Sequence, residues 1–230
     1  MKNSDFLVVG VIGTQGVGKS TICNILVNER TNFDYHTSIF KDEDGIFPTK
    51  LKPHKCSARS RTESTHMFIT SDRLILLDSP PVLCNSYKKD MITNELDDLR
   101  QIIVFLSVCH LLIVVHDDYC VNMSFMRLLH FAELMKPGMD NKPFISDYFP
   151  NLLFVKNRAK RQDFTLAAQN KMDQMLKSLF RDSQLRIYQG QQSSLEQKSR
   201  KARNMPDAER IVNSFLLPEV DKGERFLFYY

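Results

Sequence analysis

Residues 10–21 read Gly-Val-Ile-Gly-Thr-Gln-Gly-Val-Gly-Lys-Ser-Thr, and positions 13–20 within them fit the pattern G-x-x-x-x-G-K-S. A short, valine-rich apolar run precedes the pattern at residues 6–12, which is typical of a buried parallel strand. Apolar residues at helical spacing follow at residues 21–27. A glycine-rich loop between a buried strand and a helix is the context that makes this pattern a phosphate-binding loop.

Each residue type in the loop has a chemical reason to be there. Glycines let the backbone curl so that successive N–H groups point at phosphate oxygens, and the following helix directs its N-terminal dipole at the same anion. Lys19 would reach the outer phosphates, and the Ser20 hydroxyl would ligate Mg²⁺. The alternative is a glycine-rich turn that binds nothing, which the agreement of loop, lysine and serine disfavours. The predicted nucleotide-binding residues of the loop are Gly13, Thr14, Gln15, Gly16, Val17, Gly18, Lys19, Ser20 and Thr21.

The length of 230 residues allows one large or two small domains, and we predict a single P-loop, G-like domain over residues 1–230. The formal net charge of +4 is mild and does not by itself imply direct contact with nucleic acid. No apolar run approaches the roughly 20 residues of a membrane helix. The first five residues are too polar and too few for a secretory signal, and the five cysteines contain no C-x-x-C pair. We therefore expect reduced thiols and a cytoplasmic protein.

Strand-like and helix-like segments alternate along the chain. Two strand-like runs at 65–70 and 73–78 are separated by two residues, as in a tight hairpin. This pattern predicts a doubly wound α/β domain of the P-loop NTPase class, G-domain-like, with a mainly parallel sheet and one antiparallel hairpin strand. Further elements are expected as helices at 96–108, 124–136, 163–180 and 207–216, strands at 111–115 and 151–157, a long switch-like loop at 30–64 and a mobile loop at 190–205.

The second strand of the hairpin ends in an acidic residue. Asp78 follows Leu-Ile-Leu-Leu, and an aspartate at this position is the expected second metal-side group of a phosphate-loop protein. Thr62 lies just before the hairpin, where a switch threonine would reach the metal. We therefore predict a Mg²⁺ site formed by Ser20, Asp78 and Thr62.

The residues after Asp78 depart from a working GTPase. A γ-phosphate sensor needs the glycine N–H of D-x-x-G, but the chain has Pro81 there, and proline has no N–H. The next residue is Val82, which cannot orient a water molecule in the way that a glutamine does. His66 and His110 are loose candidates for that task, although a lone histidine more often has a structural role.

The base-recognition motif is also incomplete. Guanine selectivity comes from N-K-x-D, and this chain has Asn157-Arg158-Ala159-Lys160 after its strand. Asn157 fits, and the stem of Arg158 can cover a base, so both join the predicted nucleotide-binding residues. Lys160 carries only donors and cannot accept hydrogen bonds from guanine, and Asp163 lies three residues too late to substitute simply. The sequence predicts a bound purine nucleotide, GDP/GTP or ADP/ATP, with little discrimination between bases and little or no hydrolysis.

These motifs together resemble the family of the ninth SMG factor of nonsense-mediated mRNA decay. The resemblance is carried by the phosphate loop and by Leu77-Asp78-Ser79-Pro80-Pro81, Val108-Cys109-His110, Ala132-Glu133-Leu134-Met135-Lys136-Pro137 and Asn157-Arg158-Ala159-Lys160-Arg161-Gln162-Asp163-Phe164. It implies a G-like regulatory subunit that forms a heterodimer with the eighth SMG factor. It also implies that this heterodimer regulates the phosphatidylinositol-kinase-like protein kinase of the pathway.

Two other functions stay open at this point. An active switch GTPase of the dynamin-like or septin-like kind would need the groups that Pro81, Val82 and Lys160 replace. A small-molecule phosphate-loop kinase would carry an arginine-rich lid, and the hairpin before Asp78 argues against it. For the partner surface, the sequence offers the basic loop at 50–61 and the apolar tail at 226–230.

Overall fold

The computed structural model describes residues 6–27, 45–47, 49, 62–84, 91–118, 121–136, 149–189 and 211–220. Within these described residues, six strands form one sheet in the order β2-β3-β1-β4-β5-β6. The strands are β1 (Leu7–Gly13), β2 (His66–Ile69), β3 (Leu74–Asp78), β4 (Leu111–His116), β5 (Asn151–Ala159) and β6 (Ser214–Pro218). Only the β2–β3 pair is antiparallel, as in the predicted hairpin. The predicted fold class, a G-domain-like P-loop NTPase with one antiparallel strand, is confirmed.

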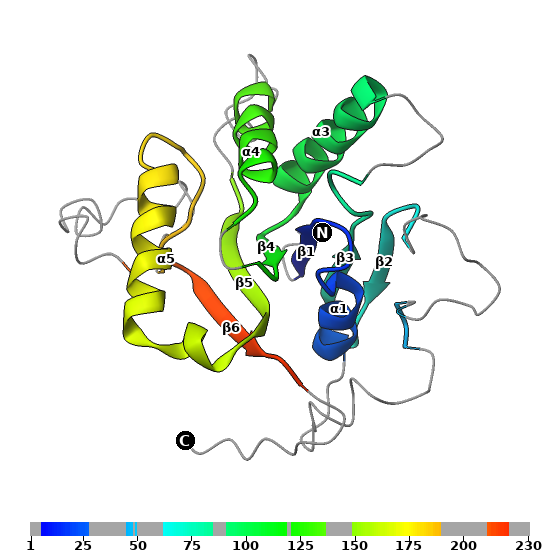
Figure 1. Cartoon of the computed structure of the whole chain (residues 1–230). Helices are drawn as coiled ribbons and strands as arrows, with labels where there is room; N and C mark the ends of the chain where they lie inside the picture. The colour runs from blue at the N-terminus through cyan, green and yellow to red at the C-terminus, as the bar shows by residue number, and fades with distance from the viewer. Residues whose placement is uncertain are drawn as a thin grey trace.

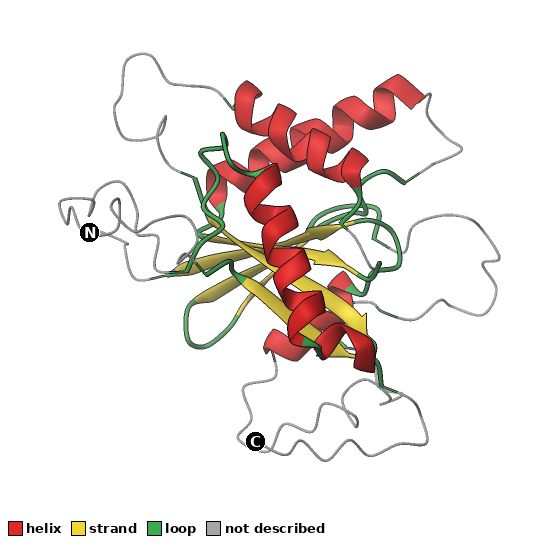
Figure 2. Ribbon diagram, turned by 60° about the vertical axis from the view of Figure 1, so that its left-hand side comes forward, coloured by secondary structure: helices red, strands yellow, loops and turns green. Residues whose placement is uncertain are grey.

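Helices cover both faces of this sheet (Figures 1 and 2). The helix α1 (Lys19–Val27) lies on one face, while α3 (Met91–Val108), α4 (Met123–Met135) and α5 (Leu166–Leu179) lie on the other. A 3-10 turn, η1 (Arg161–Phe164), precedes α5. In the part of the chain that the structure describes, none of the helices has the length and apolar character needed to cross a membrane.

The alternation of side chains along β1 explains why helices must cover both faces of the sheet. Val8 and Ile12 belong to the core beneath α3 and α4, whereas Val9 and Val11 belong to the core beneath α1. Successive side chains of a strand point to opposite faces, so a strand that is apolar throughout must be covered twice. Gly10 lies between Val9 and Val11 in β1. A Cβ added there would lie 2.6 Å from atoms of the Phe105 and Cys109 side chains. A side chain at position 10 would therefore prevent the close approach of α3.

The phosphate loop lies where the strand order reverses. The strand β1 pairs with β3 on one side and with β4 on the other. Crevices at the carboxyl ends of parallel strands open at such a switch point, and ligands of doubly wound sheets bind there. Residues 14–18 leave β1 at this point and lead directly into α1.

The C-terminal half contains two corrections. The helix predicted over 207–216 is wrong for its last residues, because 214–218 form β6, which pairs in parallel with β5; residues 201–210 lie outside the described residues. The helix predicted from Asp163 begins later, because the Thr165 hydroxyl accepts from the Ala168 N–H and so caps α5. Consequently Phe164 is half exposed, although the helical pattern predicted it to face inward. Ala167 is likewise exposed.

Several predicted segments cannot be compared. Most of the long loop at 30–64 and all of the loop at 190–205 lie outside the described residues. So do the basic loop at 50–61 and the apolar tail at 226–230. The described Phe47 is fully buried, and the Asn24 side chain of α1 holds its backbone through two hydrogen bonds of 2.8 Å. A segment that follows α1 in the sequence is thereby attached to α1 near the phosphate loop.

Candidate nucleotide site

The backbone of the phosphate loop has the conformation that its glycines predict. Gly16 and Gly18 have φ values of 81° and 93°, in the left-handed region that side chains disfavour. Gly18 is also closely approached, because a Cβ there would collide with the side-chain amide of Asn157. The loop can therefore hold its N–H groups in a concave arrangement that a Cβ-bearing sequence would strain.

Lys19 points back across the loop. Its side chain is buried, and Nζ donates to the backbone oxygens of Gly13, at 3.1 Å, and of Thr14, at 2.9 Å. Burial lowers the pKa of Lys19 to about 8, and the negative charge of Asp78 offsets part of that shift. A phosphate group would give this ammonium a stronger acceptor than two neutral carbonyl oxygens.

The predicted metal-side groups meet at the start of α1. Ser20 Oγ donates to Asp78 Oδ2 at 2.6 Å, and Asp78 is fully buried. The other carboxylate oxygen, Oδ1, has no hydrogen-bond partner, and neither has the buried hydroxyl of Ser79. Burial raises the pKa of Asp78, although the hydrogen bond from Ser20 opposes the shift.

These observations fit a Mg²⁺ ion at Ser20 and Asp78. Unpaired buried oxygens are costly, and hard oxygen ligands are what Mg²⁺ requires. A bound cation would also favour the ionised form of Asp78 over the neutral form that burial favours. Thr62 is buried just ahead of β2. Its role as a third metal ligand stays a prediction.

Residues 79–83, which follow β3, have no backbone N–H group that is left to bind a phosphate. The Ser79 N–H donates to Val11 O at 3.2 Å, the Val82 N–H to Gly13 O at 3.1 Å and the Leu83 N–H to Asp98 Oδ2 at 2.7 Å. Pro80 and Pro81 have no N–H. Between residues 79 and 83 every N–H is therefore absent or already bonded within the protein.

Val82 is equally unsuited to catalysis. Its side chain is fully buried in the core beneath α3 and α4, so it faces away from any phosphate. In addition, the Gln101 side chain of α3 donates to Pro80 O at 3.0 Å. The loop after Asp78 is thus fixed to β1 and α3 by hydrogen bonds.

The end of β5 reaches over the phosphate loop. Asn157 Nδ2 donates to Val17 O at 2.8 Å, and the Arg158 guanidinium donates to Gly16 O at 2.8 Å. Arg158 also forms an ion pair with Asp117, just after β4. Both residues that were predicted from the N-K-x-D position therefore contact the loop, whereas Asp117 was not predicted. Its position at the carboxyl end of β4 was the available signal.

Lys160 and Asp163 take no part in this arrangement. Lys160 is exposed, and Asp163 is buried and forms an ion pair of 2.7 Å with Lys156. Asp163 also accepts from the Lys160 backbone N–H at 2.8 Å. Its two carboxylate oxygens are therefore engaged within the protein, so Asp163 does not replace the missing base-reading aspartate.

The two candidate histidines have different surroundings. His110 Nδ1 accepts from the Val8 N–H at 2.9 Å, at the end of the sheet opposite the phosphate loop, so its role is structural. His66 pairs with Asp78 across the β2–β3 hairpin and interacts with it electrostatically. Of the two, only His66 borders the candidate site.

The sequence was also compared with known proteins. Protein SMG9 of Drosophila melanogaster is 36% identical over 235 residues, which are 99% of this chain and 44% of that protein. This chain belongs to the SMG9 family. The nonsense-mediated mRNA decay factors SMG9 of Xenopus laevis and Caenorhabditis elegans are 28% and 25% identical, covering 96% and 78% of the chain. They confirm the family predicted from the motifs. The chain spans about half the length of the curated SMG9 proteins it matches.

The chain was also compared with solved structures. Toc33 of Arabidopsis thaliana, a dimerization-deficient mutant, matches with a TM-score of 0.45 and 19% identity, over 80% of this chain and 66% of that one. The septin GTPase domain of Chlamydomonas reinhardtii matches with a TM-score of 0.43 and 13% identity, over 93% and 74%. No protein-family model matches the chain. The assignment of the fold rests on the strand order of the chain itself.

Proposed function

We propose that this chain is the nucleotide-binding, non-hydrolysing G-like part of a nonsense-mediated decay factor. A purine nucleotide with Mg²⁺ binds at the phosphate loop and stabilises the fold by mass action. The observation that carries the proposal is the contrast around β3. The phosphate loop, Lys19 and the Ser20–Asp78 pair are intact. Residues 79–83 offer no N–H for a γ-phosphate. Val82, which stands where a GTPase has its water-orienting residue, is buried.

We also propose the assembly in which this nucleotide acts. The chain pairs with the eighth SMG factor through a related G-like domain. The pair regulates the phosphatidylinositol-kinase-like protein kinase of the decay pathway, in the cytoplasm. Support comes from the name of the relatives, from the resemblance of the motifs and from a phosphate loop whose neighbouring stretch has Pro81 and the buried Val82.

Exposed apolar side chains on α4 support the existence of a partner. Phe131, Leu134 and Met135 follow helical spacing at i, i+3 and i+4, so they share one face of α4. Their exposed fractions are 54%, 80% and 61%. Contiguous exposed apolar surface is characteristic of interaction sites. We assign this face to the related G-like partner.

Single-turnover assays test the lack of hydrolysis. The heterodimer is loaded with GTP or ATP, and the product is measured over hours, while a separate sample is denatured to identify the nucleotide that copurifies. We expect bound nucleotide and no product above the solution rate. Hydrolysis at the rate of a stimulated GTPase would establish the switch GTPase instead. The Lys19→Ala variant should lose the nucleotide, whereas the Lys177→Ala variant on α5 should keep it.

Two matched variants test the partner surface. Leu134→Asp introduces a charge into the α4 face, and Leu166→Asp introduces the same charge at a leucine of α5 that is exposed to a similar degree, 72% against 80%. Copurification with the eighth SMG factor should be lost for Leu134→Asp and retained for Leu166→Asp. Equal binding of both variants would remove α4 from the interface.

A further inference from the structure

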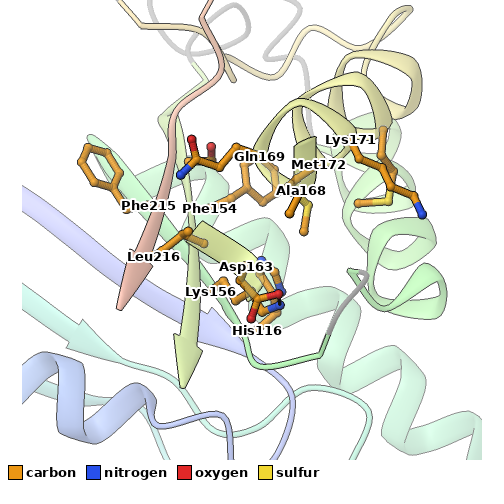
Figure 3. Close-up of a pocket in the computed structure, with 12 residues that line it drawn as sticks. His116, Phe154, Lys156, Asp163, Ala168, Gln169, Lys171, Met172, Phe215 and Leu216 are labelled. Atoms are coloured by element: carbon orange, nitrogen blue, oxygen red, sulfur yellow. Dashed lines mark ion pairs between the residues drawn. The ribbon is translucent and has the colours of Figure 1, made fainter. Parts of the chain in front are cut away.

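A cavity lies between α5 and residues of β4, β5 and β6 (Figure 3). Its volume is about 190 Å³. None of the phosphate-loop residues lines it. The lining residues are His116, Phe154, Lys156, Asp163, Ala168, Gln169, Lys171, Met172, Met175, Ser214, Phe215 and Leu216.

One end of the cavity carries an unsatisfied polar atom. His116 is 93% buried, with 7% of its surface exposed, and its Nδ1 has no hydrogen-bond partner. Burial lowers the pKa of His116, and the nearby Lys156 charge lowers it further, against the opposing effects of the Asp118 backbone and of the Asp117 and Asp118 carboxylates. The lowered pKa favours the neutral ring, which has one N–H donor and one nitrogen acceptor, and His116 is among the residues that line the cavity.

The charged residues at the same end neutralise each other. Lys156 and Asp163 are both buried and form an ion pair of 2.7 Å, and they lie beside His116 (Figure 3). The hydrogen bonds from Lys156 and Lys160 hold the pKa of Asp163 below its usual range, although burial acts in the opposite direction. At this end a ligand therefore meets a neutral imidazole beside a lysine and an aspartate that are paired with each other, which favours a neutral molecule with one polar group.

Much of the remaining wall is apolar and adaptable, and Gln169, Lys171 and Ser214 complete the lining. Phe154 comes from β5, Met172 and Met175 from α5, and Leu216 from β6. Methionine thioethers pack favourably against aromatic rings and adjust to irregular shapes. A cavity of about 150 Å³ holds benzene in a protein core. The larger volume here leaves room for a single ring with one hydroxyl group.

The cavity and the phosphate loop share two chain segments. His116 faces the cavity, and its neighbour Asp117 pairs with Arg158, which donates to the loop. Lys156 likewise lines the cavity, and its neighbour Asn157 donates to Val17 in the loop. These shared ends of β4 and β5 are the route by which we expect a change at one site to reach the other.

We propose that this cavity is an effector site for a small, neutral, one-ring aromatic hydroxyl compound, whose hydroxyl forms a hydrogen bond with the His116 imidazole and whose occupancy changes nucleotide affinity. The coupling part of the proposal rests on the proposed nucleotide binding, but ligand binding itself does not. The coupling is reciprocal, so bound nucleotide must change the affinity of the cavity ligand by the same factor.

Methyl NMR of the full chain tests the binding with 4-methylphenol as the probe. The methionine methyl signals of Met172 and Met175, assigned through Met→Leu variants, should shift on titration. The signal of Met126, which is buried in the core on the same face of the sheet but does not line the cavity, should not shift. Toluene has the same ring without the donor and should bind about tenfold more weakly. Absence of the Met172 and Met175 shifts, or equal binding of toluene, would refute the proposal.

Variants and nucleotide titrations complete the test. His116→Phe should abolish the preference for 4-methylphenol over toluene, and Ala168→Phe should fill the cavity and prevent the binding of both compounds. If His116→Phe does not fold, the toluene comparison and Ala168→Phe still decide the question. Saturating 4-methylphenol should change the affinity for ADP or GDP severalfold in the native chain and not in Ala168→Phe. Binding of 4-methylphenol without such a change would refute the effector role and leave the proposed function intact.

Discussion

Raising the pH above about 8 should weaken nucleotide binding, because Lys19 loses its proton in the nucleotide-free protein. Burial lowers the pKa of this ammonium from 10.5 to about 8, and its acceptors are two neutral backbone oxygens. Phosphate oxygens would raise that pKa on binding, since an opposite charge favours the charged form. The interaction is fully present below pH 8 and is lost as the pH rises through the pKa of the free protein.

The size of the effect follows from that pKa. One pH unit above 8, about one Lys19 in ten is still charged, so the affinity should fall about tenfold, or about 1.4 kcal/mol. The fold itself should not weaken over this range. Because the pKa of Lys19 is lower in the folded chain than in the unfolded chain, the unliganded protein gains stability between pH 8 and 10.5.

Fluorescence titrations with ADP and GDP derivatives between pH 7.5 and 9.5 measure this dependence. Over this range the phosphates of the nucleotide are already ionised. The Lys19→Arg variant is the matched control, because guanidinium stays charged and its weaker binding should not depend on pH. An unchanged affinity between pH 7.5 and 9.5, with circular dichroism showing an intact fold, would refute the reasoning.

Three further substitutions have defined outcomes. Gly10→Ala should lower the free energy of unfolding by about 1–3 kcal/mol, because its Cβ would lie 2.6 Å from core side chains; a urea midpoint equal to that of the native chain would contradict this. Asn157→Ala removes the donor to Val17 O and should weaken ADP or GDP binding about fivefold to tenfold in the same titration, with little change in the fold. Asp163→Asn leaves the buried Lys156 ammonium without its carboxylate and should cost about 3–5 kcal/mol in urea unfolding. In the native chain the stabilisation by Asp163 is present above the pKa of an unfolded aspartate, so thermal melting should show its loss as the pH falls below about 4, through the lowered pKa of Asp163.

The phosphate loop was predictable because its information is local. Gly13 to Ser20 are contiguous, and the strand before them and the helix after them are strongly patterned. The β2–β3 hairpin was equally local, with a turn at Ser71 and Asp72. These segments needed no knowledge of distant residues, so the sequence led to the correct fold class.

The C-terminal region shows where local patterns fail. Residues 214–218 follow a segment that could form a helix, but they extend along β5, where Phe154 pairs with Ser214 and Val155 with Phe215. Backbone pairing with a strand about 60 residues earlier outweighs the weak helical preference of a short segment. The Thr165 hydroxyl similarly separates η1 from α5, in a region where apolar spacing predicted one continuous helix.

At the candidate site, the sequence alone determined which hydrogen-bonding groups are present and which are missing. Pro80 and Pro81 have no N–H, Val82 has no polar group, and Lys160 has no acceptor, whatever the fold. Only the tertiary structure decided how the remaining groups are used: the Val82 N–H is bonded to Gly13, and Asp163 is paired with Lys156. The cavity at His116 also exists only in three dimensions, because β4, β5, α5 and β6 contribute its walls. Hydrogen bonding and burial depend on which distant segments meet, and the order of residues along the chain does not specify that.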